Sequence, residues 1–242
     1  MLANAISLLS FLSISAGLDG RFRACDNSQH RAPTPPSVGQ DEHTVRECSS
    51  CHSVVYCSQR CQKEDWESLH QAECRGMRNE HHVLRYTKGL RYSQTYRAFH
   101  LSVLRRAFDG ESPVLKLAKV VIPDPWSRKG VYLGRKVVLS IDVADIDDPL
   151  SVDPLPDFIK MTLPHIPKHL AKRFKDLVGL FTAFETSETD KAPVLVNGTF
   201  FYGDLEVNHL VLLRKSQAMA TTHQRQDLPP KVEICGSLVY TW

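Results

Sequence analysis

The chain has no large excess of one charge and no hydrophobic run long enough to cross a membrane. Its 242 residues include 30 lysines and arginines against 27 aspartates and glutamates, for a formal net charge of +3. Proteins that neutralise nucleic-acid phosphates usually concentrate their basic residues on one face or arm, which this balance does not indicate. The most apolar run, residues 6–14, is much shorter than the roughly 20 residues of a membrane span. The composition is that of an ordinary globular protein.

The apolar leader, residues 1–20, also lacks the basic residues that normally precede the core of a secretory signal peptide. Three interpretations remain open for it: a signal peptide, a helix that packs on the rest of the protein, or the truncated start of a longer chain. The missing basic segment favours the last two.

Cysteine is unevenly distributed along the chain. Six of the seven cysteines lie within residues 25–74, and Cys235 stands alone near the end, where we expect a small core residue of a strand. An odd number of cysteines at short spacings, mixed with histidine, is typical of a metal site in a reducing compartment rather than of a disulfide framework. We therefore expect the protein in the nucleus or cytoplasm.

The residues with the spacing of metal ligands form three close pairs: Cys48 and Cys51, Cys57 and Cys61, and His70 and Cys74. A Cys-x-x-Cys turn aims two sulfurs at one ion. Residues four apart share a face of a helix, so a helix predicted over residues 62–73 would present His70 and Cys74 together. Zinc takes four thiolate or imidazole ligands in a tetrahedron. Six ligands exceed one tetrahedral ion, so two zinc ions are predicted if all six coordinate.

The full spacing of these pairs, with Gln62, Asp65 and Trp66 between the second pair and the third, resembles the MYND zinc finger. The resemblance covers residues 25–74 and is specific over the second half of that range. It implies interleaved ligands, with Cys57 and Cys61 joining an earlier pair on one zinc. The ligands that it implies for the other zinc are Cys48, Cys51, His70 and Cys74.

The earlier pair is where this sequence departs from the family. The family has a Cys-x-x-Cys there, whereas Cys25 is followed by Ser28 at the position of the second cysteine, and the proline-rich residues 31–39 lengthen the gap. Imidazole suits zinc as thiolate does, so His30 is the first candidate for the missing ligand. His43 is a second candidate, and a site with three protein ligands is a third possibility.

A zinc site with four protein ligands has no open position for water and is therefore structural, so we expect no catalysis from it. The resemblance implies that the finger binds short proline-containing peptides of partner proteins, often transcriptional regulators. The peptide-contacting positions of the family correspond to Ser49, Gln62 and Trp66. An indole can pack against proline, but Trp66 could equally pack beneath the finger.

Two other functions are weighed against this interaction module. Some MYND fingers belong to SET-type protein lysine methyltransferases, and Asn208-His209 resembles part of a motif of that fold. The residues after it and the lack of a later cysteine cluster favour an ordinary strand position instead. Nucleic-acid binding through the arginines of residues 85–106 is the other alternative, but the acidic residues of the helix at 62–73 would repel phosphate.

The remaining periodicity predicts an α+β fold: a small zinc-stabilised finger at residues 21–77, then a mixed helix and antiparallel-sheet domain at 78–242 that resembles no family we can name. Apolar residues at helical spacing predict helices over 92–107 and 167–184. Alternation predicts strands at 114–122, 137–143, 205–213 and 232–240. Asn197-Gly198, between two short apolar runs, predicts a hairpin turn.

Overall fold

The computed structural model describes residues 25–28, 46–87, 137–142, 150–183, 193–202, 205–215 and 232–241. It also describes five residues in helical conformation: Arg97, His100, Leu101, Val103 and Leu104. The expectations for the leader, for the strand at 114–122 and for most of the helix at 92–107 lie outside the described residues.

The finger is a small hairpin followed by a long helical run. Strands β1 (Arg46–Glu47) and β2 (Val55–Tyr56) pair antiparallel. The helical run has three parts: α2 (Gln59–Asp65), a π-helical turn (Trp66–His70) and α3 (Gln71–Thr87). Ser58 caps α2 because its hydroxyl accepts a hydrogen bond of 3.1 Å from the backbone N–H of Cys61. The helix predicted over residues 62–73 is thus confirmed as part of a longer one.

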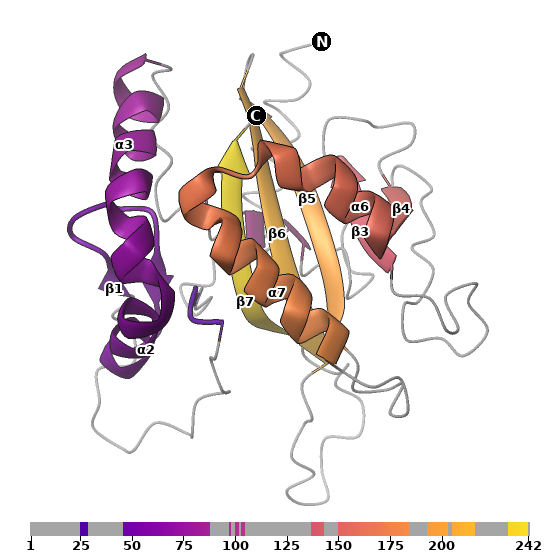
Figure 1. Cartoon of the computed structure of the whole chain (residues 1–242), viewed down its shortest axis with the longest axis horizontal. Coiled ribbons are helices and arrows are strands. Elements are labelled where there is room, and N and C mark those ends of the chain that lie inside the picture. The colour runs from indigo at the N-terminus through magenta and orange to yellow at the C-terminus, as the bar shows by residue number, and fades with distance from the viewer. Residues whose placement is uncertain are drawn as a thin grey trace, which may run out of the picture.

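A five-stranded mixed sheet stands beside the finger, in the order β4-β3-β5-β6-β7 (Figure 1). Its strands are β3 (Val137–Asp142), β4 (Leu150–Pro154), β5 (Val194–Tyr202), β6 (Leu205–Lys215) and β7 (Val232–Thr241). Only β3 and β5 run parallel; the other neighbours are antiparallel. The α+β class is confirmed.

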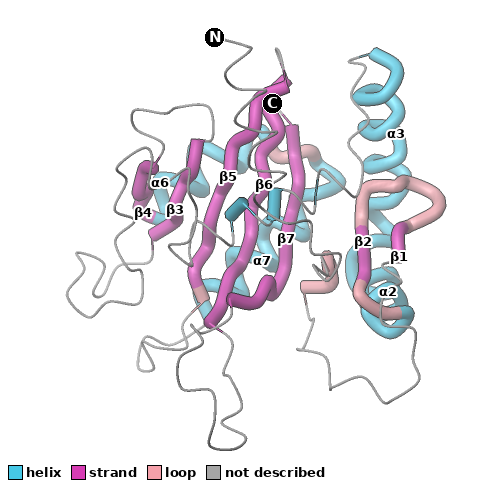
Figure 2. The backbone as a smooth tube through the Cα atoms, turned by 180° about the vertical axis from the view of Figure 1, so that it is seen from behind, coloured by secondary structure: helices cyan, strands magenta, loops and turns pink. Residues whose placement is uncertain are grey.

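Helices α6 (Leu155–Thr162) and α7 (Ala171–Ala183) lie across one face of the sheet, joined by the 3-10 turns Leu163–His165 and Lys168–Leu170 (Figure 1). Figure 2 shows the sheet from the opposite side, with α3 beside β7. The helix predicted over 167–184 corresponds to the second 3-10 turn and α7. Helix α6 and strand β4 were not predicted from the sequence. None of the described helices is long and apolar enough to cross a membrane.

Both faces of the sheet are buried, as the alternation along β5 shows. Leu195 faces the cluster that contains α6 and α7, whereas its neighbours Val194 and Val196 face a second cluster with Leu101 and Leu104. Successive side chains of a strand point to opposite faces, so one run of apolar residues supplies both cores.

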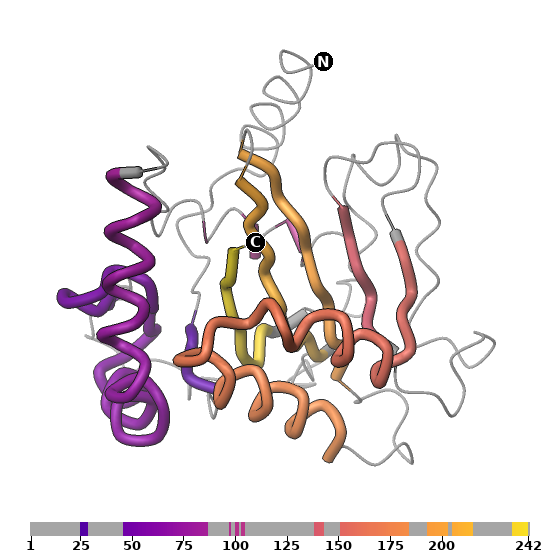
Figure 3. Tube along the Cα trace, turned by 45° about the horizontal axis from the view of Figure 1, so that its top comes forward, coloured from indigo at the N-terminus to yellow at the C-terminus, as the bar shows by residue number. Residues whose placement is uncertain are grey.

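The first cluster also contains the finger. Five of the finger's cysteines belong to the same set of buried residues as Phe158, Phe174 and Leu177 of the two helices. The short segment 25–28 lies between the finger and α7 (Figure 3). The finger therefore packs on the helical layer through one continuous core.

The hairpin turn predicted at Asn197-Gly198 is wrong, because both residues lie inside β5. The side-chain oxygen of Asn197 accepts a hydrogen bond of 3.0 Å from the Tyr240 hydroxyl. A Cβ atom at position 198 would lie 2.5 Å from Leu104 Cδ2, so glycine permits the close approach of this leucine. Only residues 203–204 separate β5 from its antiparallel partner β6.

Candidate metal centre

The first candidate site brings together Cys48 and Cys51 of the hairpin, His70 at the end of the π-helical turn and Cys74 of α3. All four side chains are buried, and their ligand atoms lie within 4.8 Å of one another. Cys48 Sγ lies 3.9 Å from Cys74 Sγ, and Cys51 Sγ lies 3.5 Å from His70 Nε2. A zinc tetrahedron with Zn–S near 2.3 Å and Zn–N near 2.0 Å has edges of about 3.8 and 3.5 Å. The donor set and its spacing fit zinc, with Nε2 of His70 as the ligand atom.

The turn between Cys48 and Cys51 is closed by local backbone bonds. The N–H of His52 donates to the carbonyl of Cys48 at 2.9 Å, and His52 itself has a φ of 56°, in the left-handed region. The N–H of Ser53 points at Cys51 Sγ, 3.5 Å away. Such N–H groups stabilise thiolates, the form in which cysteine binds a metal.

The two hairpin cysteines differ in acidity. Burial raises the pKa of Cys48, but the N–H groups of Cys51 and Ser50, together with the His70 ring, outweigh it and lower this pKa to about 6. Burial is the main cause that raises the pKa of Cys51 well above its usual range.

The second candidate site consists of three cysteines, Cys25, Cys57 and Cys61, whose sulfurs lie within 4.8 Å of one another. Cys57 lies just before the cap of α2 and Cys61 lies in the first turn of that helix, and their sulfurs are 3.6 Å apart. The proximity of these two thiols, and then burial, raise the pKa of Cys25 far above its usual range. Three converging sulfurs suit a tetrahedral zinc that takes one more ligand. His30 and His43 lie outside the described residues, so the identity of that ligand stays a prediction.

The residues predicted to contact a peptide lie close in sequence to ligand positions of both sites. Ser49, next to Cys48, is exposed, and Gln62 is half-buried. Trp66 is 40% exposed, and its ring meets the His70 ring edge-on, with centroids 5.7 Å apart. The tryptophan thus lies at the surface, directly against a ligand of the first site.

A buried ionic cluster behind the finger was not predicted from the sequence. Arg173 of α7 is 1% exposed and donates to the carboxylates of Glu73 and Asp65, at 2.7 and 2.8 Å, and to the carbonyl of Asp26 at 2.6 Å. The Tyr56 hydroxyl donates to the same oxygen of Asp65, at 2.7 Å. Burial lowers the pKa of Arg173, but the two carboxylates outweigh it and raise the pKa, so the guanidinium stays charged.

One feature of the sequence could have indicated this cluster. Arg173 comes three residues after Leu170 and four before Leu177, so it lies on the apolar face of its helix. A charged residue in that position is buried only where opposite charges meet it.

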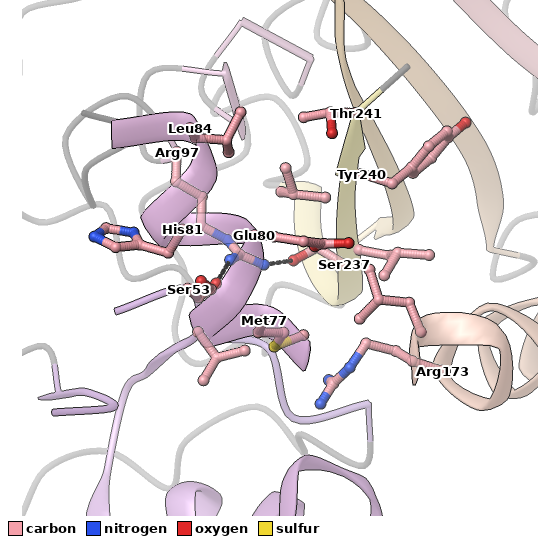
Figure 4. A pocket seen from close by; sticks show the side chains of 14 residues that line it. Ser53, Met77, Glu80, His81, Leu84, Arg97, Arg173, Ser237, Tyr240 and Thr241 are labelled. Carbon is pink, nitrogen blue, oxygen red and sulfur yellow. Dashed lines mark hydrogen bonds between the residues drawn. The ribbon is translucent and has the colours of Figure 1, made fainter. Parts of the chain in front are cut away.

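A second arginine, Arg97, connects the finger to the sheet. Its guanidinium binds the Asp26 carboxylate and the Ser53 carbonyl, and it donates to the Ser237 hydroxyl of β7 at 3.3 Å. Arg97 and Arg173 line a cavity between α3 and β7 (Figure 4), whose volume is about 50 Å³. Pockets for drug-sized ligands have about 300–1,000 Å³, so this one has room only for small polar molecules such as water.

Comparisons with known proteins identify the finger. Residues 36–74 match the MYND finger family, a range that begins after Cys25. A segment of 36 residues is 50% identical to ubiquitin carboxyl-terminal hydrolase 19 of Arabidopsis thaliana, which covers 15% of this chain and 5% of that protein. A segment of 39 residues is 41% identical to SET domain-containing protein 14 of Caenorhabditis elegans, covering 16% and 9%. No solved structure matches the chain.

The chain therefore carries a MYND finger, and its two cysteine and histidine clusters fit the two zinc sites of such a finger. MYND fingers generally mediate protein interaction, so a protein partner is implied. The rest of the chain is not assigned to a family by these matches, which cover only small parts of both relatives.

Proposed function

We propose that this protein is an adaptor, in the nucleus or cytoplasm, whose finger binds a proline-containing segment of a partner protein. The observation that carries this proposal is the exposed indole of Trp66, held against the buried zinc ligand His70. The exposed part of this indole is available to a partner, and its flat apolar face suits the proline ring.

Gln62 and Ser49 supply the polar groups of this proposed surface. Gln62 precedes Trp66 by four residues, so the two side chains are neighbours on the helical surface. Its amide can donate to and accept from the backbone of an extended peptide. Ser49, exposed next to Cys48, offers a hydroxyl for the same purpose.

The metal sites and the buried ionic cluster make this surface rigid before a peptide arrives. The helix that carries Gln62 and Trp66 holds zinc-ligand positions at both ends, Cys61 and His70, and Asp65 between them binds Arg173. A preorganised surface loses little conformational entropy on binding, which favours capture of a short peptide.

The test is the binding of fluorescently labelled proline-containing peptides to the zinc-loaded chain, measured by fluorescence anisotropy. We expect Trp66→Ala to weaken binding at least tenfold, or about 1.4 kcal/mol, as a central aromatic contact does. Tyr86→Ala is the matched control, because Tyr86 is a 66% exposed aromatic residue near the end of α3, away from the metal ligands. Wild-type affinity in Trp66→Ala protein with full zinc content would refute the proposal.

No observation on the described residues favours the methyltransferase alternative. Asn208 and His209 are buried positions of β6, 1% and 0% exposed, as the strand interpretation predicts. A rise in melting temperature with S-adenosylmethionine would reopen that alternative.

A further inference from the structure

We propose that Arg173, on helix α7, is a positioning residue for the first zinc site of the finger. It holds the Glu73 carboxylate behind His70, so that the finger retains this zinc fully only while α7 is docked on it. The inference concerns a residue about a hundred positions downstream of the finger, outside the segment that matches the MYND family.

The argument starts at the two ring nitrogens of His70. Nε2 lies 3.5 Å from Cys51 Sγ, on the side where the ion would be bound. Nδ1 is buried and has no hydrogen-bond partner among the described residues; Oε2 of Glu73 faces it from 3.9 Å. A small approach of this carboxylate would give the carboxylate–histidine–zinc arrangement that commonly orients metal-bound histidines.

Glu73 cannot take this position unaided, because a buried carboxylate needs a compensating charge. Its relative exposure is 1%, and both of its oxygens accept hydrogen bonds from Arg173. Nε of Arg173 lies 3.2 and 3.0 Å from the two oxygens, and Nη2 lies 2.7 Å from Oε2. The planar guanidinium therefore determines the orientation of the carboxylate as well as its charge.

Arg173 is itself held by two further parts of the finger. It donates to the carboxylate of Asp65, the residue just before the π-helical turn. It also donates to the carbonyl of Asp26, next to Cys25. Moving α7 away would remove the only arginine or lysine that forms an ion pair with Glu73 among the described residues. Docking of the helical layer and orientation of His70 are thus linked through one side chain.

The chemical consequence concerns the tautomer of His70. A carboxylate at Nδ1 keeps the proton on that nitrogen, which leaves the lone pair of Nε2 for the metal. If Glu73 turned away, the ring would lose both its orientation and part of its basicity. Zinc would then leave the first site faster, whereas the site of Cys57 and Cys61 would be unaffected.

The experiment measures zinc release from the full chain after addition of a chromophoric chelator, which resolves the two ions by rate. The variants are Glu73→Gln and Arg173→Lys, the latter of which keeps the charge but loses the forked contact. We expect both variants to release the zinc of the first site about 10–100-fold faster. Glu73→Gln should release the other ion at the wild-type rate, whereas Arg173→Lys, which also alters the contact with the Asp26 carbonyl next to Cys25, should affect that ion less than the first. The double variant should be no faster than Glu73→Gln, because both changes act through the same carboxylate.

Lys172→Ala is the matched control on α7, since Lys172 reaches the finger from an exposed position, through the Ser68 carbonyl at 2.7 Å. It should leave both rates unchanged. A second readout is ¹⁵N NMR of His70, in which the Nδ1 proton should exchange with solvent faster in Arg173→Lys. The proposal is overturned if Arg173→Lys releases both ions at the wild-type rate, or accelerates both equally through general loosening. The proposal is also overturned if the release rate of the double variant rises by the product of the two single-variant factors.

Discussion

Replacing Phe174 with alanine should destabilise the finger and the sheet together. Phe174 of α7 is 1% exposed, and its ring lies 6.5 Å from that of Phe158 on α6. It belongs to the same core cluster as the finger's buried cysteines and the inward residues of β6 and β7. The cavity left by its removal would thus lie in the core that the finger and the sheet share.

The expected magnitude follows from burial. Truncating a fully buried phenylalanine costs about 3–5 kcal/mol, which combines lost transfer free energy with an unfilled cavity. The total stability of a protein of this kind is about 5–15 kcal/mol, so the change is a large fraction of it. At about 2–4 °C per kcal/mol for a chain of this length, the melting temperature should fall by roughly 6–20 °C.

The assay is urea unfolding followed by far-ultraviolet circular dichroism and by chelator access to zinc. Phe201→Ala is the matched control, because the same truncation is made in β5 at a side chain that is 42% exposed; it should cost less than about 1 kcal/mol. With a shared core, the two probes should report one transition that shifts as a whole. Equal effects of both substitutions, or a shift of circular dichroism alone with unchanged zinc access, would refute the reasoning.

Two further predictions concern the contact of α3 with the helical layer and the acidity of the metal site. Gly76→Ala should destabilise the protein by about 1–3 kcal/mol through overpacking, since its Cβ would lie 2.3 Å from Cγ of His169; urea unfolding should show most of the loss relieved when His169→Ala is added. Zinc binding to the first site at pH 7.5 should release a proton from Cys51, whose pKa burial raises, and any proton that the His70 ring holds on Nε2, since Glu73 and Cys48 outweigh burial and raise the pKa of that ring. Cys48, whose pKa is about 6, should release little. Affinity should therefore rise with pH near neutrality and fall further below pH 6 as Cys48 is protonated; calorimetry in buffers of different ionisation enthalpy measures the protons, and a pH-independent affinity would contradict this assignment.

The sequence by itself determined those features of the metal sites that depend on short-range geometry. The pair spacings of Cys48 and Cys51 and of His70 and Cys74 suffice, because a tight turn and one turn of helix each bring two ligands together. The α+β class, α7 and strands β3, β6 and β7 were predictable for a similar reason, since apolar periodicity reflects which face of an element is buried.

Only the tertiary structure decided the features that depend on contacts distant in the sequence. Arg173 of α7 meets Glu73 of α3, a hundred residues earlier in the chain. The meeting of Cys25 with Cys57 and Cys61, by contrast, was already implied by the resemblance, and the structure brings the three sulfurs together. Asn197-Gly198 has the local preference of a turn, yet it remains inside β5 because Leu104 and Tyr240 pack against it. Local preference amounts to about 1 kcal/mol per residue, and long-range burial and hydrogen bonding can outweigh it.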